Sequence, residues 1–130
     1  SALIAEYDVS SGDATIINAG HPPAYCISEN CLTELPGSGR LLGVTSGNNF
    51  RAAKFRFERG DTLFFYTDGL LEATDAAGYE FGAHRLRELL DSTRTLNPGP
   101  RERRVVRELA SFHGPRSHED DLTILQIRKL

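Results

Sequence analysis

Three aspartates in two distant parts of the chain are candidates for metal chemistry. Asp68 comes just after the apolar stretch TLFFY, and Asp120 and Asp121 come just before the apolar stretch LTILQI. If these stretches are neighbouring antiparallel strands, the end of one lies beside the start of the other. The three carboxylates would then meet at one edge of a sheet and repel one another. A hard divalent cation such as Mg²⁺ or Mn²⁺, which prefers oxygen ligands, would offset that repulsion.

Gly69 is part of the same candidate site, because a residue without a Cβ lets the backbone approach a ligand closely. Ordinary turn chemistry is the alternative for all four positions. Asp-Gly is a common turn dipeptide, and an aspartate before a strand often caps the preceding loop. Spacing alone leaves the metal site and the turns as open alternatives.

The elements that must position these residues follow from hydrophobic periodicity. Two β-hairpins are expected first, built from ALIAEYD with ATIINA and then from AYCIS with CLTEL. An alternating strand around Phe55 and Phe57 and a turn at 59–61 precede TLFFY, which we expect to be covered on both faces. Amphipathic helices are predicted over 81–96 and 101–114, separated by a break at NPGP, and a last strand follows. This order predicts an α+β fold with helices packed on antiparallel sheet.

Composition narrows the possible functions. The 130 residues suit one compact domain, and a formal net charge of −3 argues against nucleic-acid binding. The basic cluster RERRVVR is interpreted as the solvent-exposed face of a helix. We found no leader and no apolar run near the roughly 18 residues of a membrane span, so a cytoplasmic location is expected. Cys26 and Cys31 are interpreted as reduced thiols without a structural role.

Five motifs occur in a familiar order: NAGHPP at 18–23, LLG at 41–43, RGDTLFFYTDGLLEA at 59–73, YEFGAHRL at 79–86 and EDDLTIL at 119–125. Each is weak alone, but together they span nearly the whole chain. They resemble the C-terminal part of the metal-dependent protein phosphatase 2C-like (PPM) serine/threonine phosphatases. The bacterial branch named after stage II sporulation protein E is the most similar one.

The resemblance implies an antiparallel β-sandwich flanked by helices, with two Mn²⁺ or Mg²⁺ ions at one edge. Asp68 matches the metal-binding aspartate of the family's YTDG motif, and Asp120 matches the one that opens the DD motif, with Asp121 as a further ligand. Water activated by the metals would attack phosphoserine or phosphothreonine. The implied setting is bacterial partner-switching and stress signalling. There the substrate is a phosphorylated anti-sigma-factor antagonist, and a sensor domain often shares the chain.

One family motif has no counterpart here. The family carries an earlier aspartate followed closely by Gly-His, whose aspartate bridges both metals, and no such motif is found in residues 1–130. We therefore interpret 1–130 as the C-terminal part of a phosphatase domain. Weak metal binding and little activity are expected of this chain alone, and a homodimer formed through exposed sheet edges is predicted. A catalytically inactive phosphatase-like module for protein binding or regulation is the alternative, and a carboxylate-metal nuclease is a weaker one.

Four further side chains have open interpretations. His21 is either a general acid or a loop histidine satisfied by backbone groups, and we favour the loop role because its motif precedes a hairpin. Glu72 either orients a water at the metals or is a solvated acid at a helix start. Thr67 and Thr123 adjoin the acids and could hydrogen-bond them, although β propensity explains both equally well.

Overall fold

The fold was analysed in a computed structural model that describes residues 1–37, 40–44, 50–113 and 121–130. Seven strands, two α-helices and one 3₁₀ turn make up these ranges. In chain order they are β1 (Ala2–Tyr7), β2 (Asp13–Ala19), β3 (Ala24–Ile27), β4 (Leu32–Leu35), β5 (Ala52–Arg56), β6 (Thr62–Tyr66), η1 (Asp68–Leu70), α1 (Gly82–Ser92), α2 (Pro98–His113) and β7 (Ile124–Arg128).

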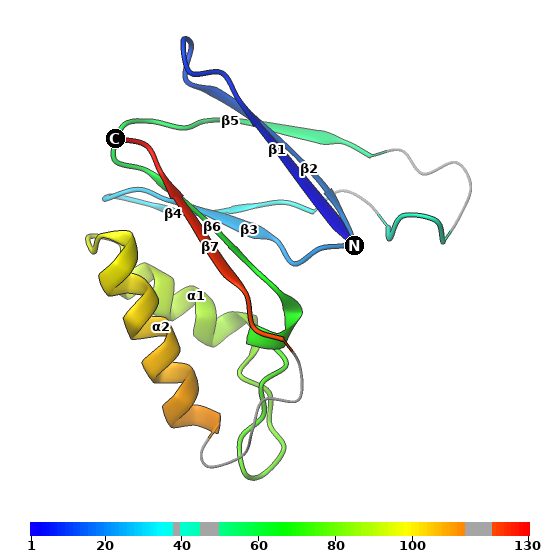
Figure 1. Cartoon of the computed structure of the whole chain (residues 1–130), viewed down its shortest axis with the longest axis vertical. Coiled ribbons are helices and arrows are strands. Elements are labelled where there is room, and N and C mark those ends of the chain that lie inside the picture. Colours follow the sequence, from blue (N-terminus) through cyan, green and yellow to red (C-terminus); the bar gives the residue numbers. More distant parts are fainter. Residues whose placement is uncertain (38–39, 45–49, 114–120) are drawn as a thin grey trace.

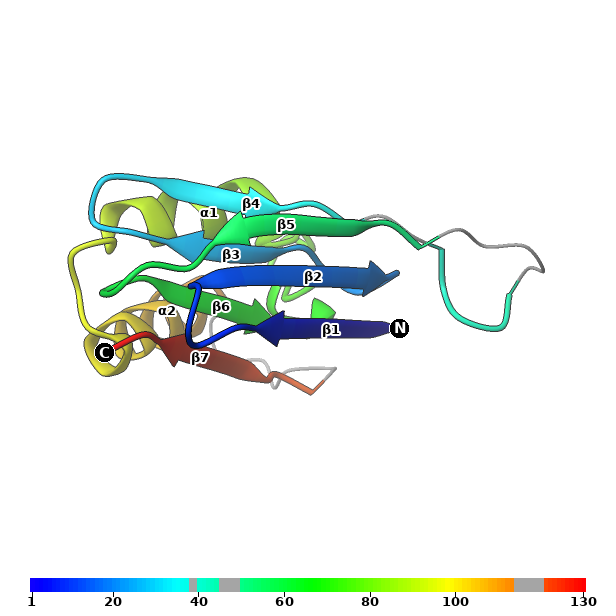
Figure 2. The same ribbon diagram turned by 90° about the horizontal axis from the view of Figure 1, so that it is seen from above.

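The strands form two stacked antiparallel sheets with the helices on one outer face (Figure 1). One sheet has the order β1-β2-β5 and the other the order β4-β3-β6-β7. Figure 2 shows the three-stranded sheet lying over the four-stranded one, with α1 and α2 on the far side of the latter. This arrangement confirms the α+β fold class, an antiparallel sandwich flanked by helices. The two predicted hairpins are confirmed as β1–β2 and β3–β4.

The residues of β6 face both layers of the core, as expected for TLFFY. Leu63 packs between the two sheets with Cys26 and Phe57, whereas Phe64 and Tyr66 pack under the helices. The helices contribute buried apolar residues at helical spacing: Leu86, Leu89 and Leu90 from α1, and Val105 and Leu109 from α2. Because both faces of β6 are covered, its position is set from two sides, and so is the start of the segment that carries Asp68.

The turn at 59–61 connects the two sheets. The amide of Asp61 donates to the Glu58 carbonyl at 3.0 Å, and the Asp61 carboxylate accepts from the Glu58 amide at 2.8 Å. The strands on either side do not pair with each other, because β5 pairs with β2 and β6 pairs with β3 and β7. The chain therefore crosses from one layer to the other at this turn.

Both predicted helix boundaries at the NPGP break were wrong. α1 ends at Ser92, earlier than expected, where the Thr93 hydroxyl donates to the Leu89 carbonyl at 2.8 Å. α2 begins at Pro98, inside the predicted break. Proline is tolerated in a first helical turn, because the amide hydrogen it lacks would have no partner within the helix there.

The prediction for the basic cluster was wrong at Arg101. The basic cluster at 101–107 was expected to be solvent-exposed, and Arg103, Arg104 and Arg107 are exposed, but Arg101 is only 1% exposed. Its guanidinium donates to the carbonyls of Thr93 (3.4 Å), Arg94 (3.1 Å) and Leu96 (2.8 Å), and to Gln126 Oε1 (3.0 Å). Arg101 therefore ties the loop between the helices to α2 and β7.

The two cysteines differ in environment, and no disulfide joins them in this structure. Cys26 is buried in β3, and burial, with a smaller contribution from Asp61, raises the pKa of its thiol to about 12. Cys31 is exposed.

Because the thiolate is the reactive form, we predict that a disulfide reagent at pH 8 modifies one thiol per folded chain and two after denaturation. Cys31→Ser should abolish the reaction of the folded chain, and fast labelling of Cys26 there would contradict the burial.

The sandwich has open edges at β1 and β7. Among the described residues each of these strands has a single strand partner, β2 for β1 and β6 for β7. Ile4 on β1 and Leu125 and Ile127 on β7 are exposed apolar side chains. The homodimer expected from such edges stays a prediction. No described helix has the length and apolarity needed to cross a membrane.

Candidate metal-binding edge

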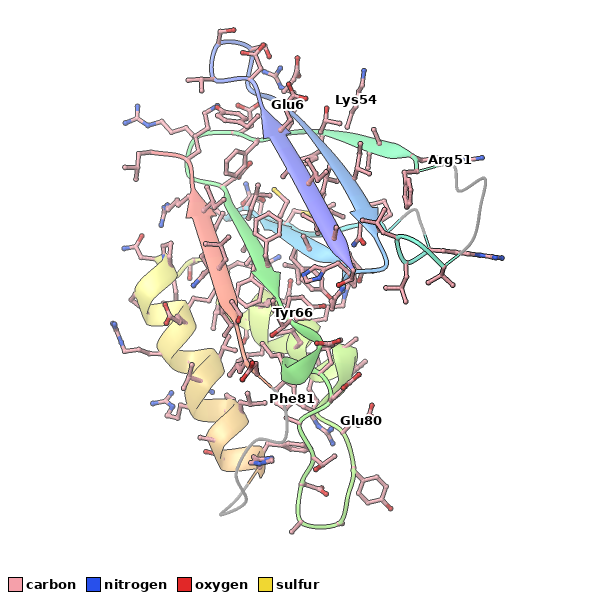
Figure 3. The ribbon with its side chains drawn as sticks, turned by 45° about the vertical axis from the view of Figure 1, so that its right-hand side comes forward. Glu6, Arg51, Lys54, Tyr66, Glu80 and Phe81 are labelled. Atoms are coloured by element: carbon pink, nitrogen blue, oxygen red, sulfur yellow. The ribbon has the colours of Figure 1, made fainter. Side chains whose placement is uncertain are left out.

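The ends of β6 and β7 that carry the candidate acids lie side by side. β6 and β7 pair antiparallel, with Tyr66 opposite Ile124, so Asp68 follows one strand at the point where Asp121 precedes the other. Figure 3 labels Tyr66 where β6 leads into η1, next to the start of β7. The antiparallel neighbourhood that the metal hypothesis requires is therefore present. Asp120 lies outside the described residues.

Thr67 joins these two segments beyond the regular ladder. Its amide donates to the Thr123 carbonyl at 3.1 Å, and its hydroxyl donates to the Asp121 carbonyl at 2.9 Å. The same hydroxyl accepts from the Thr123 amide at 2.9 Å. The Thr67 hydroxyl thus binds backbone groups and not the carboxylates, whereas a bond from the Thr123 hydroxyl to an acid stays an open interpretation. The effect of the Thr67 bonds is to hold the backbone that carries Asp121 next to the residue before Asp68.

We predict that Thr67→Val loosens this connection. Removing the hydroxyl deletes two hydrogen bonds, each worth about 0.5–1.5 kcal/mol, although water can replace part of them at this partly exposed position. The Thr123 amide should then exchange with solvent about tenfold faster in hydrogen-exchange NMR. Thr15→Val, in the middle of β2, is the control and should leave that amide unchanged. Equal protection of Thr123 in both variants would show that the hydroxyl does not hold the segment.

Asp68 begins the 3₁₀ turn and is exposed to solvent. Its carbonyl accepts from the amides of Leu71 (2.8 Å) and Glu72 (3.0 Å), and its carboxylate accepts from the Gly69 amide at 3.2 Å. Gly69 is buried within this turn. The local turn chemistry and an outward-facing carboxylate therefore coexist at Asp68.

The acidic groups present at this edge fit a hard divalent cation in kind, because they are carboxylate oxygens on exposed side chains. They are few: among the described residues no three His, Cys, Asp or Glu side chains converge as a metal-binding group. Glu72 is exposed and lies in the irregular segment after η1, so it does not begin a helix. Its role at the edge stays open.

His21 lies at the same end of the four-stranded sheet as Asp68, contrary to the reason given for its loop role. β3 is antiparallel to β6, so the residues before β3 lie at the end where β6 finishes. The His21 backbone is held by Asn18, which is 1% exposed: Asn18 Oδ1 accepts from the His21 amide at 2.9 Å, and Asn18 Nδ2 donates to the His21 carbonyl at 2.8 Å. The backbone bonds agree with a structured loop.

Two residues of the NAGHPP motif acquire a role that the sequence did not assign. Asn18 organises the turn, and the only signal was its place before Gly and Pro, where an Asx turn is common. Gly20 has φ +72°, and a Cβ there would lie 3.1 Å from the Leu41 backbone nitrogen and 2.8 Å from Leu41 Cδ2. The first and second of the five motifs therefore touch each other.

Comparisons with known proteins agree with this architecture. The chain is 22% identical to phosphoserine phosphatase RsbU of Bacillus subtilis over 127 aligned residues. This alignment covers 96% of the chain and 37% of RsbU. The SiaA-PP2C domain of Pseudomonas aeruginosa superposes with a TM-score of 0.82 at 23% identity, over 97% of this chain and 50% of that one. The manganese-presoaked phosphatase domain of SpoIIE from Bacillus subtilis superposes with a TM-score of 0.71 at 15% identity, over 98% and 56%.

This chain thus spans between about a third and somewhat more than half of the length of these three proteins. The family model described as stage II sporulation protein E (SpoIIE) matches residues 1–130, which is the entire sequence. The chain therefore belongs to the SpoIIE family of PP2C-type phosphatase domains and corresponds to part of such a domain.

Proposed function

We propose that this chain supplies one metal-binding edge of a metal-dependent phosphoprotein phosphatase. Asp68, Asp120 and Asp121 would hold Mn²⁺ or Mg²⁺, with the backbone at Gly69 close to the ions. A bound divalent ion would lower the pKa of water and stabilise negative charge on a phosphoryl group. The chain's own contribution is to hold the carboxylates in position before an ion binds.

The observation that supports this proposal is the pair of hydrogen bonds that joins the end of β6 to the segment before β7. The Thr67 hydroxyl contacts the Asp121 carbonyl and the Thr123 amide, across more than fifty residues of chain. Such a connection is not needed to terminate either strand, since the ladder itself ends at Tyr66 and Ile124. It restricts the relative motion of two acidic segments, and preorganised ligands bind an ion with a smaller entropic cost.

We also propose the substrate class and the setting. Membership of the family and the similarity to a phosphoserine phosphatase support a phosphoserine or phosphothreonine protein as substrate. The same resemblance favours a phosphorylated anti-sigma-factor antagonist, within a partner-switching stress response in the cytoplasm. A sensor domain in the same natural protein fits that role.

The test is release of phosphate from a phosphoserine peptide by the natural protein that contains this sequence. Release should require Mn²⁺ or Mg²⁺, stop in excess EDTA, and resume when the metal is restored. The isolated 130-residue chain should show little or none of this activity. Metal-independent hydrolysis would contradict the proposal, and a protein that binds phosphopeptide without cleaving it would favour the inactive phosphatase-like module.

A further inference from the structure

Four arginines surround a cavity at the end of the four-stranded sheet opposite Asp68. The cavity has a volume of about 370 Å³ and is lined by the β3–β4 turn, the β5–β6 turn, the loop between α1 and α2, and the ends of α2 and β7. The arginines are Arg59, Arg94, Arg101 and Arg128. β6 runs between this cavity and the candidate metal edge, so the two lie about 20 Å apart at the rise of an extended strand.

The cavity is cationic although the protein is acidic. Against its four arginines the lining holds two carboxylates, Glu29 and Asp61, while the whole chain carries a formal charge of −3. The Asp61 carboxylate is already used in its own turn, where it accepts from the Glu58 amide. Positive charge is therefore gathered at this site beyond what neighbouring acids balance.

The arginines have few acidic partners of their own. Within the part of the chain that the structure describes, no ion pair joins Arg59, Arg101 or Arg128 to a carboxylate. Arg101 is bound by carbonyl oxygens and Gln126 only, and Arg128 donates to the Asn97 amide oxygen. Burial, and then the nearby charge of Arg128, lower the pKa of Arg101. Arg101 and Arg128 therefore both present positive charge to the same cavity.

Arg94 adds an unused donor. Its Nη1 donates to the Asn30 carbonyl at 3.2 Å and pairs with Asp91 at 3.3 Å, but its Nε is buried and has no hydrogen-bond acceptor among the described residues. An unpaired buried donor costs free energy, so a small shift of the Arg94 side chain that brings Nε to an acceptor in the cavity would be stabilising. Arginine is also the side chain best suited to bind phosphate oxygens through paired donors.

We propose that this cavity binds a phosphate group, either free orthophosphate or the phosphoryl group of a small monoester. Arg59 and Arg128 at the lining supply the direct contacts, and the charge of buried Arg101 adds attraction to the anion. The site does not depend on the proposed phosphatase chemistry, because it uses none of the residues at the metal edge. Phosphate bound here would hold together the β5–β6 turn, the interhelical loop and β7.

The test is calorimetric titration of orthophosphate into the chain in EDTA at constant ionic strength, with sodium chloride as the reference titrant. We expect saturable binding at one site, with amide shifts in ¹⁵N NMR at Asn30 and Gly60. Arg59→Gln and Arg128→Gln should each weaken binding about tenfold or more, as expected for a lost charge-assisted hydrogen bond. The matched control is Arg107→Gln, an exposed arginine of α2 outside the cavity, which should change the affinity less than twofold.

Glycerol phosphate, titrated in parallel, distinguishes the two sources of the phosphoryl group. Tighter binding of glycerol phosphate than of orthophosphate would indicate a monoester ligand, and the reverse would indicate the free ion. Absence of saturable binding to both probes would overturn the proposal. So would an equal loss of affinity in Arg59→Gln and Arg107→Gln, because it would reduce the effect to net charge.

Discussion

Arg101→Met is expected to lower the free energy of unfolding by about 2–4 kcal/mol. The substitution keeps most of the aliphatic volume but removes every donor from three carbonyls and Gln126 Oε1, all at a position that is 1% exposed. Acceptors left unpaired in a buried site each cost free energy, and the relief of Arg101's own desolvation offsets only part of the loss. Urea denaturation followed by circular dichroism measures the difference.

Arg103→Met is the matched control for this prediction. It makes the same chemical change one half-turn along α2, at an exposed position, and should alter the unfolding free energy by no more than about 0.5 kcal/mol. Arg101→Lys should resemble Arg101→Met, because a single ammonium cannot reach the carbonyls on two sides that the planar guanidinium spans. Similar stability of Arg101→Met and Arg103→Met would mean that the buried hydrogen bonds contribute nothing net.

Asp68→Asn is expected to weaken Mn²⁺ binding by about 100-fold or to abolish it. The amide keeps the shape of the side chain and loses the negative charge that a hard cation requires. Even changes to residues that only orient metal ligands cost 10–100-fold in affinity, so a lost ligand stands at or above the top of that range. Because one carboxylate edge alone should bind metal weakly, calorimetry at high protein concentration is the suitable measurement.

Glu102→Gln provides the control for charge, since it removes one exposed carboxylate on α2 without touching the metal edge. It should leave the Mn²⁺ affinity unchanged within twofold. Asp121→Asn should behave like Asp68→Asn if both carboxylates reach the same ion. Mn²⁺ binding of normal strength in Asp68→Asn would remove Asp68 from the proposed site and leave it as a turn residue.

The strands and the layers could be predicted because their cause is local. The alternation of apolar and charged residues along 54–58 predicted a half-buried strand, and β5 alternates in this way up to Arg56. The unbroken run TLFFY predicted a strand covered on both faces, and β6 is such a strand. The helical spacing of Leu86, Leu89 and Leu90 likewise predicted the buried face of α1. The helix ends were harder to predict from the sequence, because prolines at 98 and 100 are compatible with both a break and a first helical turn.

From the sequence, the candidate metal-binding edge could be predicted only on the condition that the two strands are neighbours. The sequence placed acids at the end of one apolar stretch and the start of another, and the pairing of Tyr66 with Ile124 satisfies the requirement that the strands be antiparallel neighbours. Whether Asp68, Gly69, Asp120 and Asp121 bind metal stays a prediction. The sequence left open whether the hydroxyl of Thr67 binds the carboxylates. Its partners in the structure are backbone groups, a choice that depends on register to within one residue.

By itself, the amino-acid sequence determined the order and type of the elements, which side of each helix is apolar, and that two acidic segments are available to meet. Only the tertiary structure decided that Arg101 is buried while Arg103 is exposed, that Asn18 holds the loop at His21, and that four arginines surround one cavity. The physical reason is the separation along the chain of the residues that interact. Periodicity arises from neighbours a few residues away, whereas these contacts join atoms whose distance is set by how separate turns, helices and strands pack together.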